Sequence, residues 1–477
     1  MVGVGPLMIS NNCKTKAVGE NKMAIYNIAS TVLVAGINFL TIPIFTRILD
    51  TDGFGVVNIY TAWVQICTIF VGMKADGSIG SAHANLQNDE QDDYQLSCLT
   101  MGLLSFVVIL GLCLAFIKPL SVMLSMDGLL IIAMVLQSFG AFVIALFSMR
   151  FIFRKEPQKN FALSVGVAIS TTAVSVVLIL SGAFGVNAYL GRVLGLSLPN
   201  LLIGICLFFV LVRKGASVRI RYWAFCLSLT LPLIFHGLSQ LLLAQTGKIA
   251  IQQVQGNSAA GVYSIAVTVV SLLNAIYNAL NNAFVPFMYD DLAGKTSEDK
   301  KLSHFRNYFS LFTLGTCAFA LMSPEVLKIL STESYWEATR LLPPLVLGQY
   351  CVFLYSFPVN YEFYKMQTRS IAVGTMAAAV LNVAVCVLVV PAFGMDGAAC
   401  SSAIAYLFLF IFHFLIARFL LGDRNYPTKW FAFGLFAVLI ACLTCVPADG
   451  IPLVRWLAGF ACLAFAISRI VRSRSIF

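Results

Sequence analysis

The sequence predicts an all-α polytopic membrane protein with about 14 transmembrane helices. Hydrophobic residues make up 59% of the 477 residues and charged residues only 11%, whereas a soluble domain normally carries about 25% charged residues. The mean hydropathy is +0.88. The apolar residues also form long continuous runs rather than alternating with polar residues, which favours membrane helices over a membrane β-barrel.

Fourteen apolar segments are the predicted spans, because a helix of about 20 apolar residues crosses a bilayer. The last two segments are short, and the boundaries carry errors of a few residues. No loop is long enough for a soluble catalytic domain, and the longest predicted loops are 74–95 and 289–306. The predicted cores are 23–45, 56–73, 96–117, 128–149, 160–182, 189–212, 223–246, 262–288, 307–330, 339–361, 370–390, 396–417, 430–446 and 452–468.

The basic residues predict that both termini are cytoplasmic. With the N-terminus inside, the inner segments hold most of the 31 Lys and Arg residues, as the topology rule for cytoplasmic loops requires. Loop 74–95 is internal by parity although it is rich in acidic residues, which weigh little in that rule. The outer segments hold only Arg47, Lys118, Lys248, Lys328, Arg340 and Arg455.

Two pseudo-symmetric six-helix lobes account for most of the chain. A weak internal echo supports them, because Gly55-Val56 opens span 2 and Gly261-Val262 opens span 8. Internal repeats are common in transporters. The predicted parts are a cytoplasmic leader (1–22), an N-lobe with spans 1–6 (23–212), a C-lobe with spans 7–12 (223–417) and two additional spans (430–468).

Polar side chains form rows in spans 1, 2, 7 and 8, because residues three or four apart share one face of a helix. One interpretation is a hydrophilic cavity between the lobes, lined by these spans. The other interpretation is that these side chains form hydrogen bonds between packed helices. We interpret Gln349, Asn360 and Asn382 in this second way. The row in span 8 is Ser264, Thr268, Ser271, Asn274, Asn278 and Asn281. The candidate cavity residues are Asn38, Asn58, Gln65, His236, Gln240, Asn274, Asn278 and Asn281.

Four cations lie near the predicted outer ends of spans: Arg47, Arg192, Lys248 and Arg340. They either form a receptor for an anionic headgroup such as phosphate or reach the interface by snorkelling. Arg47 and Lys248 border the polar rows. Together with Arg192, they are added to the cavity residues above as candidate substrate-binding residues.

Acidic groups are scarce inside the spans. The nearest ones lie at span ends or in loops, so no buried acidic site for a coupling cation is evident. The sequence has no Walker A motif and no histidine spacing typical of a metal site. We therefore expect no cofactor, no metal and no catalytic residue. The carboxylates concerned are Asp76, Asp290, Asp291 and Glu362.

The first two spans resemble the polysaccharide transporter family, the O-antigen and capsule repeat-unit flippases of the multidrug/oligosaccharidyl-lipid/polysaccharide (MOP) superfamily. The resemblance covers 27–50 and 53–60, and its most specific element is Pro43-x-x-x-Arg47 followed by Gly55. The segment 255–264 (QGNSAAGVYS) is similar to the matching element of the second half.

The resemblance implies a flippase of the bacterial cytoplasmic (inner) membrane with two V-shaped lobes. Its substrate would be an undecaprenyl-pyrophosphate-linked oligosaccharide, moved by alternating access for surface polysaccharide biosynthesis. Membrane lipids, a polysaccharide polymerase and glycosyltransferases are the expected partners, and nucleic acid is not. The alternatives are a cation-coupled multidrug exporter, a flippase for lipid II or a teichoic-acid precursor, and a membrane-embedded polymer ligase or polymerase.

Overall fold

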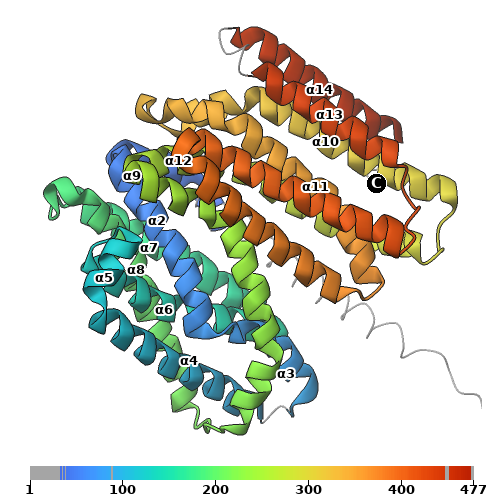
Figure 1. Ribbon diagram of the computed structural model, residues 1–477. Coiled ribbons are helices and arrows are strands. Elements are labelled where there is room, and N and C mark those ends of the chain that lie inside the picture. The colour runs from blue at the N-terminus through green and yellow to red at the C-terminus, as the bar shows by residue number, and fades with distance from the viewer. Residues whose placement is uncertain (1–32, 35, 38, 88–89, 446–450, 474–477) are drawn as a thin grey trace, which may run out of the picture. The chain divides into compact units, whose positions relative to one another are not determined.

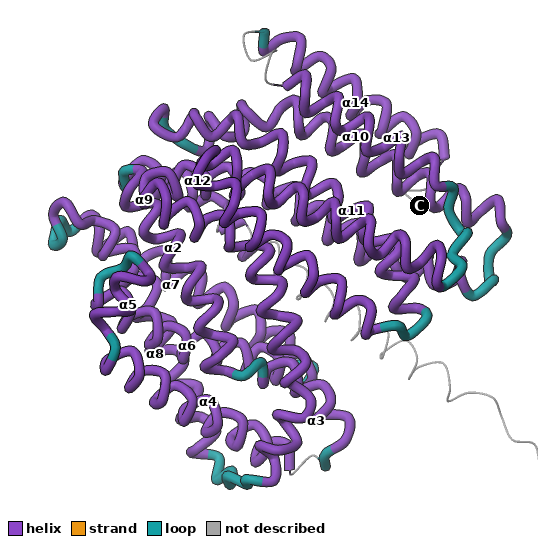
Figure 2. The backbone as a smooth tube through the Cα atoms, viewed as in Figure 1, coloured by secondary structure: helices purple, strands orange, loops and turns teal. Residues whose placement is uncertain are grey.

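The computed structural model describes residues 33–34, 36–37, 39–87, 90–445 and 451–473 (Figure 1). These residues form helices joined by short loops, with no strand among them (Figure 2). Helices suit a chain in lipid, because each backbone N–H and C=O finds its partner within the same segment. The all-α membrane fold is thus confirmed, whereas the predicted leader 1–22 lies outside the described residues.

The long helices follow the predicted spans closely. A shorter apolar helix, Phe39–Ile48, covers the end of span 1. The long helices are α2 (Thr51–Gly72), α4 (Glu90–Ala115), α6 (Gly128–Phe153), α7 (Pro157–Leu180), α8 (Ala188–Arg213), α9 (Arg221–Leu292), α10 (Glu298–Leu330), α11 (Leu342–Tyr364), α12 (Thr368–Leu415), α13 (Thr428–Cys445) and α14 (Pro452–Ser473). The short ones are α3 (Ile79–Asn85), α5 (Ile117–Leu124), the 3-10 segments Ala75–Ser78, Gly185–Asn187 and Glu333–Leu341, and the π-helical turn Ile416–Leu420.

Two glycine kinks divide α9 and α12 into pairs of spans. An unbroken helix of 72 residues would be about 108 Å long, several times the hydrocarbon thickness. Gly256 (φ 84°, ψ −178°) interrupts α9 and Gly394 (φ 55°, ψ −133°) interrupts α12. Positive φ values are accessible to glycine at little cost. Each half then corresponds to one predicted span, and the described helices match predicted spans 2–14 and the end of span 1.

Two expected loops are largely helical instead. Residues 74–95 hold a single turn, α3 and the start of α4, and residues 289–306 hold the end of α9 and the start of α10. Hydropathy identifies only the part of a helix that lies in hydrocarbon. The polar turns beyond it remain helical where acidic residues such as Glu298 and Asp299 occupy the first turn, which the helix dipole favours.

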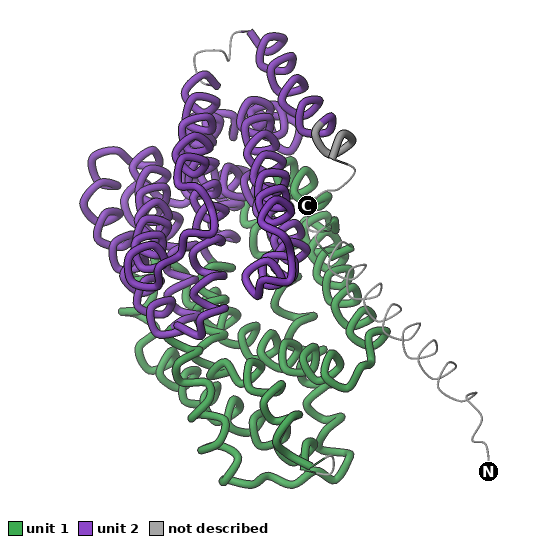
Figure 3. Tube along the Cα trace, turned by 90° about the vertical axis from the view of Figure 1, so that its right-hand side faces the viewer, with its two compact units in different colours: residues 1–48, 60–235 green, residues 49–59, 236–477 purple. Residues whose placement is uncertain are grey.

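The chain divides into two compact units (Figure 3). Unit 1 comprises residues up to 48 and 60–235, and unit 2 comprises 49–59 and 236–477. In unit 1, α6 packs against α8 so closely that a Cβ at Gly140 would lie 2.3 Å from the backbone oxygen of Asn200. In unit 2, α11 packs along α12, and α13 and α14 pack against α10 (Figure 1). The site described next lies in unit 2.

Candidate functional site

The second half of α9 carries the predicted polar row on one face. Asn274 and Asn281 are half-buried, whereas Ser271 and Asn278 are exposed. The hydroxyl of Ser271 donates to the backbone oxygen of Thr268 at 2.6 Å, within the same helix. The row is therefore accessible along much of this helix, although the surrounding sequence is strongly apolar.

Amide groups connect this row to α11. Gln349 Nε2 donates to Asn274 Oδ1 at 3.1 Å, and Asn278 Nδ2 approaches the same oxygen at 3.4 Å. Asn360 Nδ2 approaches Asn281 Oδ1 at 3.4 Å. The two interpretations of the row therefore both apply, because its amides join α9 to α11 while part of the row stays open. An exposed amide facing hydrocarbon is costly, so this open part is suited to water or to a polar ligand.

A cavity of about 160 Å³ lies beside the row, between both halves of α9, α11 and α12. Neutral polar groups from all three helices line the cavity. One of them is Gln349, for which the sequence analysis predicted a role in helix packing. Within the described ranges, no charged residue lines this cavity. The lining residues are Leu243, Ala244, Tyr263, Val267, Val270, Ser271, Asn274, Leu345, Gly348, Gln349, Ser402 and Tyr406.

Lys248 lies next to this cavity on the first half of α9. Its neighbour Gly247 contacts Tyr263, since a Cβ on that glycine would lie 2.7 Å from the Tyr263 hydroxyl. Ala244, which lines the cavity, lies one turn before Lys248 on the same helical face. Within the described part of the chain, Lys248 is half-buried and has no hydrogen bond or ion pair. A partly buried cation without a partner is costly, and an anionic ligand would reduce that cost.

Two of the other outer cations already have partners. Arg340 is paired with Glu337 at 2.9 Å and with Asp396 at 3.4 Å. In unit 1, Arg192 donates to Ser175 Oγ at 2.9 Å, and its guanidinium lies 3.9 Å from the centre of the Phe45 ring. Arg192 therefore packs through cation–π and hydrogen-bond contacts.

Arg47 differs from these two arginines, because its side chain is exposed. It donates to the backbone oxygen of Pro43 at 2.8 Å. This contact lies within its own helix, so the charge remains accessible.

The remaining predicted site residues are placed as follows. Asn58 donates to the backbone oxygen of Phe54 at 2.9 Å, within α2. Gln65 is exposed. Gln240 Nε2 and His236 Nε2 lie 3.3 Å apart on one face of α9. Asn38 lies outside the described residues. Among the described candidates, Asn274 lines the cavity and Lys248 lies beside it, whereas the others do not line it.

The glycines of the internal echo meet at a close helix crossing within unit 2. A Cβ on Gly55 would lie 1.9 Å from the backbone oxygen of Asn257, and a Cβ on Gly261 would lie 2.2 Å from that of Thr51. Thr51 Oγ1 and Ser258 Oγ form a hydrogen bond of 2.7 Å at the same crossing. These two glycines form part of the internal repeat in the sequence. Because they lack a Cβ, they allow the start of α2 to contact α9.

Sequence reasoning missed a buried acid–imidazole pair. Glu362 and His413 are both fully buried, with His413 Nδ1 2.6 Å from Glu362 Oε1. Ser370 also donates to Glu362. Glu362 lies near the end of α11, as expected, but its carboxylate is shielded by α12. No signal in a single sequence links positions 362 and 413, because their pairing depends on how α11 packs along α12.

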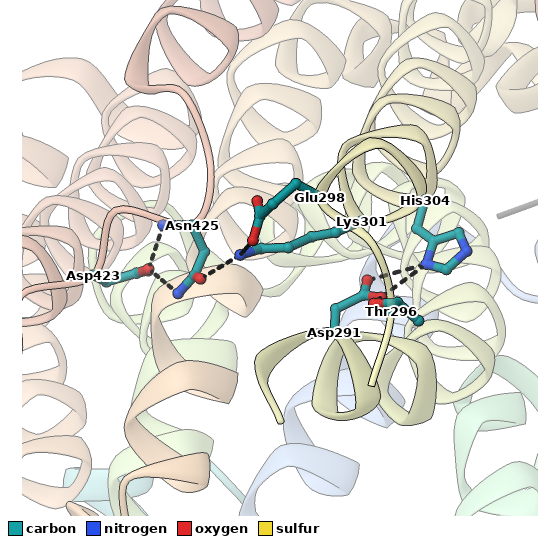
Figure 4. Close-up of polar contacts among 7 residues, drawn as sticks. All are labelled: Asp291, Thr296, Glu298, Lys301, His304, Asp423 and Asn425. Carbon is teal, nitrogen blue, oxygen red and sulfur yellow. Dashed lines mark hydrogen bonds and ion pairs between the residues drawn. The ribbon is translucent and has the colours of Figure 1, made fainter. Parts of the chain in front are cut away.

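A second buried carboxylate, Asp291, anchors a polar network at the end of α9 (Figure 4). His304 Nδ1 lies 3.0 Å from Asp291 Oδ2, and Thr296 donates to Asp291. Nearby, Lys301 Nζ donates to Asn425 Oδ1 at 2.7 Å. These contacts connect the α9–α10 turn to the segment before α13. Because the groups satisfy one another, we interpret this network as a structural link.

Comparison with known proteins identifies the family. The profile of a family described as "Polysaccharide biosynthesis protein" matches residues 21–290, more than half of the chain. This chain belongs to that family. Two proteins of Haemophilus influenzae are similar in sequence. An "uncharacterized membrane protein" is 21% identical over 349 residues, covering 70% of this chain and 81% of the relative. "Lsg locus putative protein 1" is 22% identical over 364 residues, covering 72% and 85%.

Solved transporter structures share the fold. The lipid II flippase MurJ in its inward closed conformation aligns with a TM-score of 0.63 and 14% identity, covering 94% of this chain and 99% of that structure. An inward-facing multidrug resistance MATE family transporter of the MOP superfamily aligns with a TM-score of 0.60 and 16% identity, covering 84% and 94%. This member of the polysaccharide biosynthesis family is therefore a multi-pass membrane protein with the fold of MOP-superfamily transporters and flippases.

Proposed function

We propose that this protein is a flippase for an undecaprenyl-pyrophosphate-linked oligosaccharide repeat unit in the bacterial cytoplasmic membrane. The observation that carries the proposal is Lys248 in a member of a polysaccharide biosynthesis family. This cation has no partner among the described residues and lies beside a cavity that is lined in part by polar groups. The protein would move its cargo by alternating access and would catalyse no reaction. A polymerase and glycosyltransferases would act on the same cargo.

The physical problem that such a protein solves is the barrier to moving a charged headgroup. Burying an isolated pyrophosphate in hydrocarbon costs on the order of tens of kcal/mol. A polar helix face lowers that barrier while the lipid tail remains in the bilayer. The exposed side chain of Asn278 lies on such a face, and Lys248 provides a positive charge for the headgroup. A role in binding for the other predicted residues, Arg47 and Arg192 among them, stays a prediction from the sequence.

Lys248→Ala tests this proposal in the cell. We expect the variant to lose surface polysaccharide and to accumulate the lipid-linked repeat unit, with unchanged protein level. Lys248→Arg should retain most of the activity, since it keeps the charge. Lys118→Ala is the matched control, because Lys118 is an exposed lysine predicted on the same side of the membrane. Normal polysaccharide in the Lys248→Ala strain would contradict the assignment.

A cation-coupled multidrug exporter is the second candidate, favoured by the buried Glu362–His413 pair. Buried carboxylates in membrane helices often bind the coupling ion. Here the carboxylate is already paired with His413 and bonded by Ser370, and it does not line the cavity. Overexpression distinguishes the two candidates. An exporter raises resistance to cationic drugs, whereas the proposed flippase leaves resistance unchanged.

A further inference from the structure

We infer that the cavity in unit 2 binds one neutral sugar ring of the cargo, next to the anionic group attracted by Lys248. This inference rests on the proposed function and adds a specific subsite to it. The subsite would be formed by α9, α11 and α12. It would select the cargo by the charge of a sugar rather than by the lipid.

The volume of the cavity fits a single ring. It measures about 160 Å³, and a cavity of about 150 Å³ in another protein accommodates benzene, which is a six-membered ring. A whole oligosaccharide is far larger than this space. One pyranose ring could therefore enter the cavity while the rest of the glycan remained outside it.

The lining has the chemistry of a neutral sugar site. Asn274 and Gln349 supply amides, and Ser271 supplies a hydroxyl, so both donors and acceptors are available for sugar hydroxyls. Tyr406, which is half-buried, adds an aromatic ring that can cover the apolar C–H face of a sugar while its hydroxyl forms a hydrogen bond. This mixture favours a sugar over a purely apolar ligand.

The lining also disfavours an acidic sugar. None of the described residues that line the cavity is a lysine, an arginine or a histidine. A uronic acid placed there would lose hydration of its carboxylate without gaining a cationic partner, which is costly. The cation lies outside, at Lys248.

The position of Lys248 matches the order of groups in the cargo. In a lipid-pyrophosphate-sugar the phosphate is bonded directly to the first ring. Side chains on a helix lean towards its N-terminus, so a lysine at position 248 can reach towards Ala244, which lines the cavity. Gly247 contacts the Tyr263 hydroxyl, which places the backbone of Lys248 next to the same cavity. A ring in the cavity would therefore bring its phosphate close to the ammonium group.

The test compares three short-chain probes on purified full-length protein in detergent. The probes are farnesyl pyrophosphate, the same lipid carrying N-acetylglucosamine, and the same lipid carrying glucuronic acid. We expect the N-acetylglucosamine probe to bind about tenfold more tightly than the bare lipid, since two or three additional hydrogen bonds supply about that factor. The glucuronic acid probe should gain no affinity over the bare lipid.

Ser271→Leu is designed to fill the cavity. Ser271 is exposed and bonds only within its own helix, so the fold should tolerate the change. We expect this variant to bind the bare lipid as the wild type does but to lose the tenfold sugar advantage. Ala275→Leu is the matched control, because Ala275 is exposed one turn further along α9 and does not line the cavity. Gln349→Ala is a second variant, expected to reduce the advantage by removing one amide.

The outcomes separate the inference from the proposed function. If the wild type binds neither the bare lipid nor the sugar probes, the proposed function is contradicted. If it binds the bare lipid but the neutral sugar adds nothing, the subsite is wrong and the flippase proposal stands. Equal affinity for neutral and acidic sugars, or a full sugar advantage in Ser271→Leu, would also overturn the subsite. In those cases the cavity holds only water or an ion.

Discussion

Replacing Gly55 with alanine tests the helix crossing of α2 and α9. The new Cβ would lie 1.9 Å from the backbone oxygen of Asn257 and 2.7 Å from its carbonyl carbon. A normal carbon–oxygen contact is about 3.3 Å or longer, so one helix must move by about 1.4 Å. Backbone atoms cannot rotate away as a side chain can. Overpacking of this kind typically costs about 1–3 kcal/mol, and sometimes more.

The assay is thermal unfolding of the purified protein in detergent, followed by tryptophan fluorescence. We expect Gly55→Ala to lower the midpoint by about 1–3 °C. Gly261→Ala should have a similar effect, because its Cβ would lie 2.2 Å from the backbone oxygen of Thr51. Gly166→Ala is the control, since nothing lies within 4 Å of its Cβ position. A Gly55→Ala variant that unfolds together with this control would refute the close crossing.

Three further substitutions test other contacts in unit 2 by the same unfolding assay. Glu362→Ala leaves His413 buried without its hydrogen-bond partner, so we expect a loss of about 1–3 kcal/mol; a wild-type midpoint would show that the pair is not buried. Arg455→Ala should be similarly destabilising, because Arg455 is 1% exposed and paired with Glu325, and it would be harmless only if α14 were detached from α10. Gly394→Ala should destabilise because its φ is 55° and its Cβ would lie 2.3 Å from Gln255 Nε2. An unchanged midpoint for Gly394→Ala would contradict the kink in α12.

Much of the fold could be predicted because lipid imposes simple rules. Long apolar runs fix where helices lie, so all the described spans agree with the predicted ones. The kinks at Gly256 and Gly394 were expected as loops, because composition shows a glycine but not whether the helix continues on both sides. Likewise, hydropathy missed the polar turns that begin α10 at Glu298.

The candidate site was predicted in part, for a related reason. The spacing of Asn274 and its neighbours predicted one polar face, since helical periodicity is a local property. Gln349 was assigned to helix packing, and the structure places it both in a hydrogen bond to Asn274 and in the cavity wall. Its role depends on α11 lying against α9. The Glu362–His413 pair could not be predicted for the same reason, because its two residues are distant in sequence and meet only when α11 packs along α12.

The cations near the predicted outer surface look alike in the sequence but have different environments in the structure. By sequence, Arg340 and Lys248 are equivalent cations at span ends. The structure gives Arg340 two carboxylate partners and gives Lys248 none among the described residues. Because an unpaired charge in a membrane protein carries a cost, Lys248 is the residue whose cost an anionic ligand would relieve.

Reconstituted transport is the measurement that tests the central claim most directly. The protein would be placed in vesicles with an undecaprenyl-pyrophosphate-linked N-acetylglucosamine, and an impermeant lectin would report how fast the sugar on the inner leaflet becomes accessible. We predict rapid exposure with the wild type and with Lys118→Ala, and a rate close to that of protein-free vesicles with Lys248→Ala. Wild-type vesicles that expose the sugar no faster than protein-free vesicles would contradict the account.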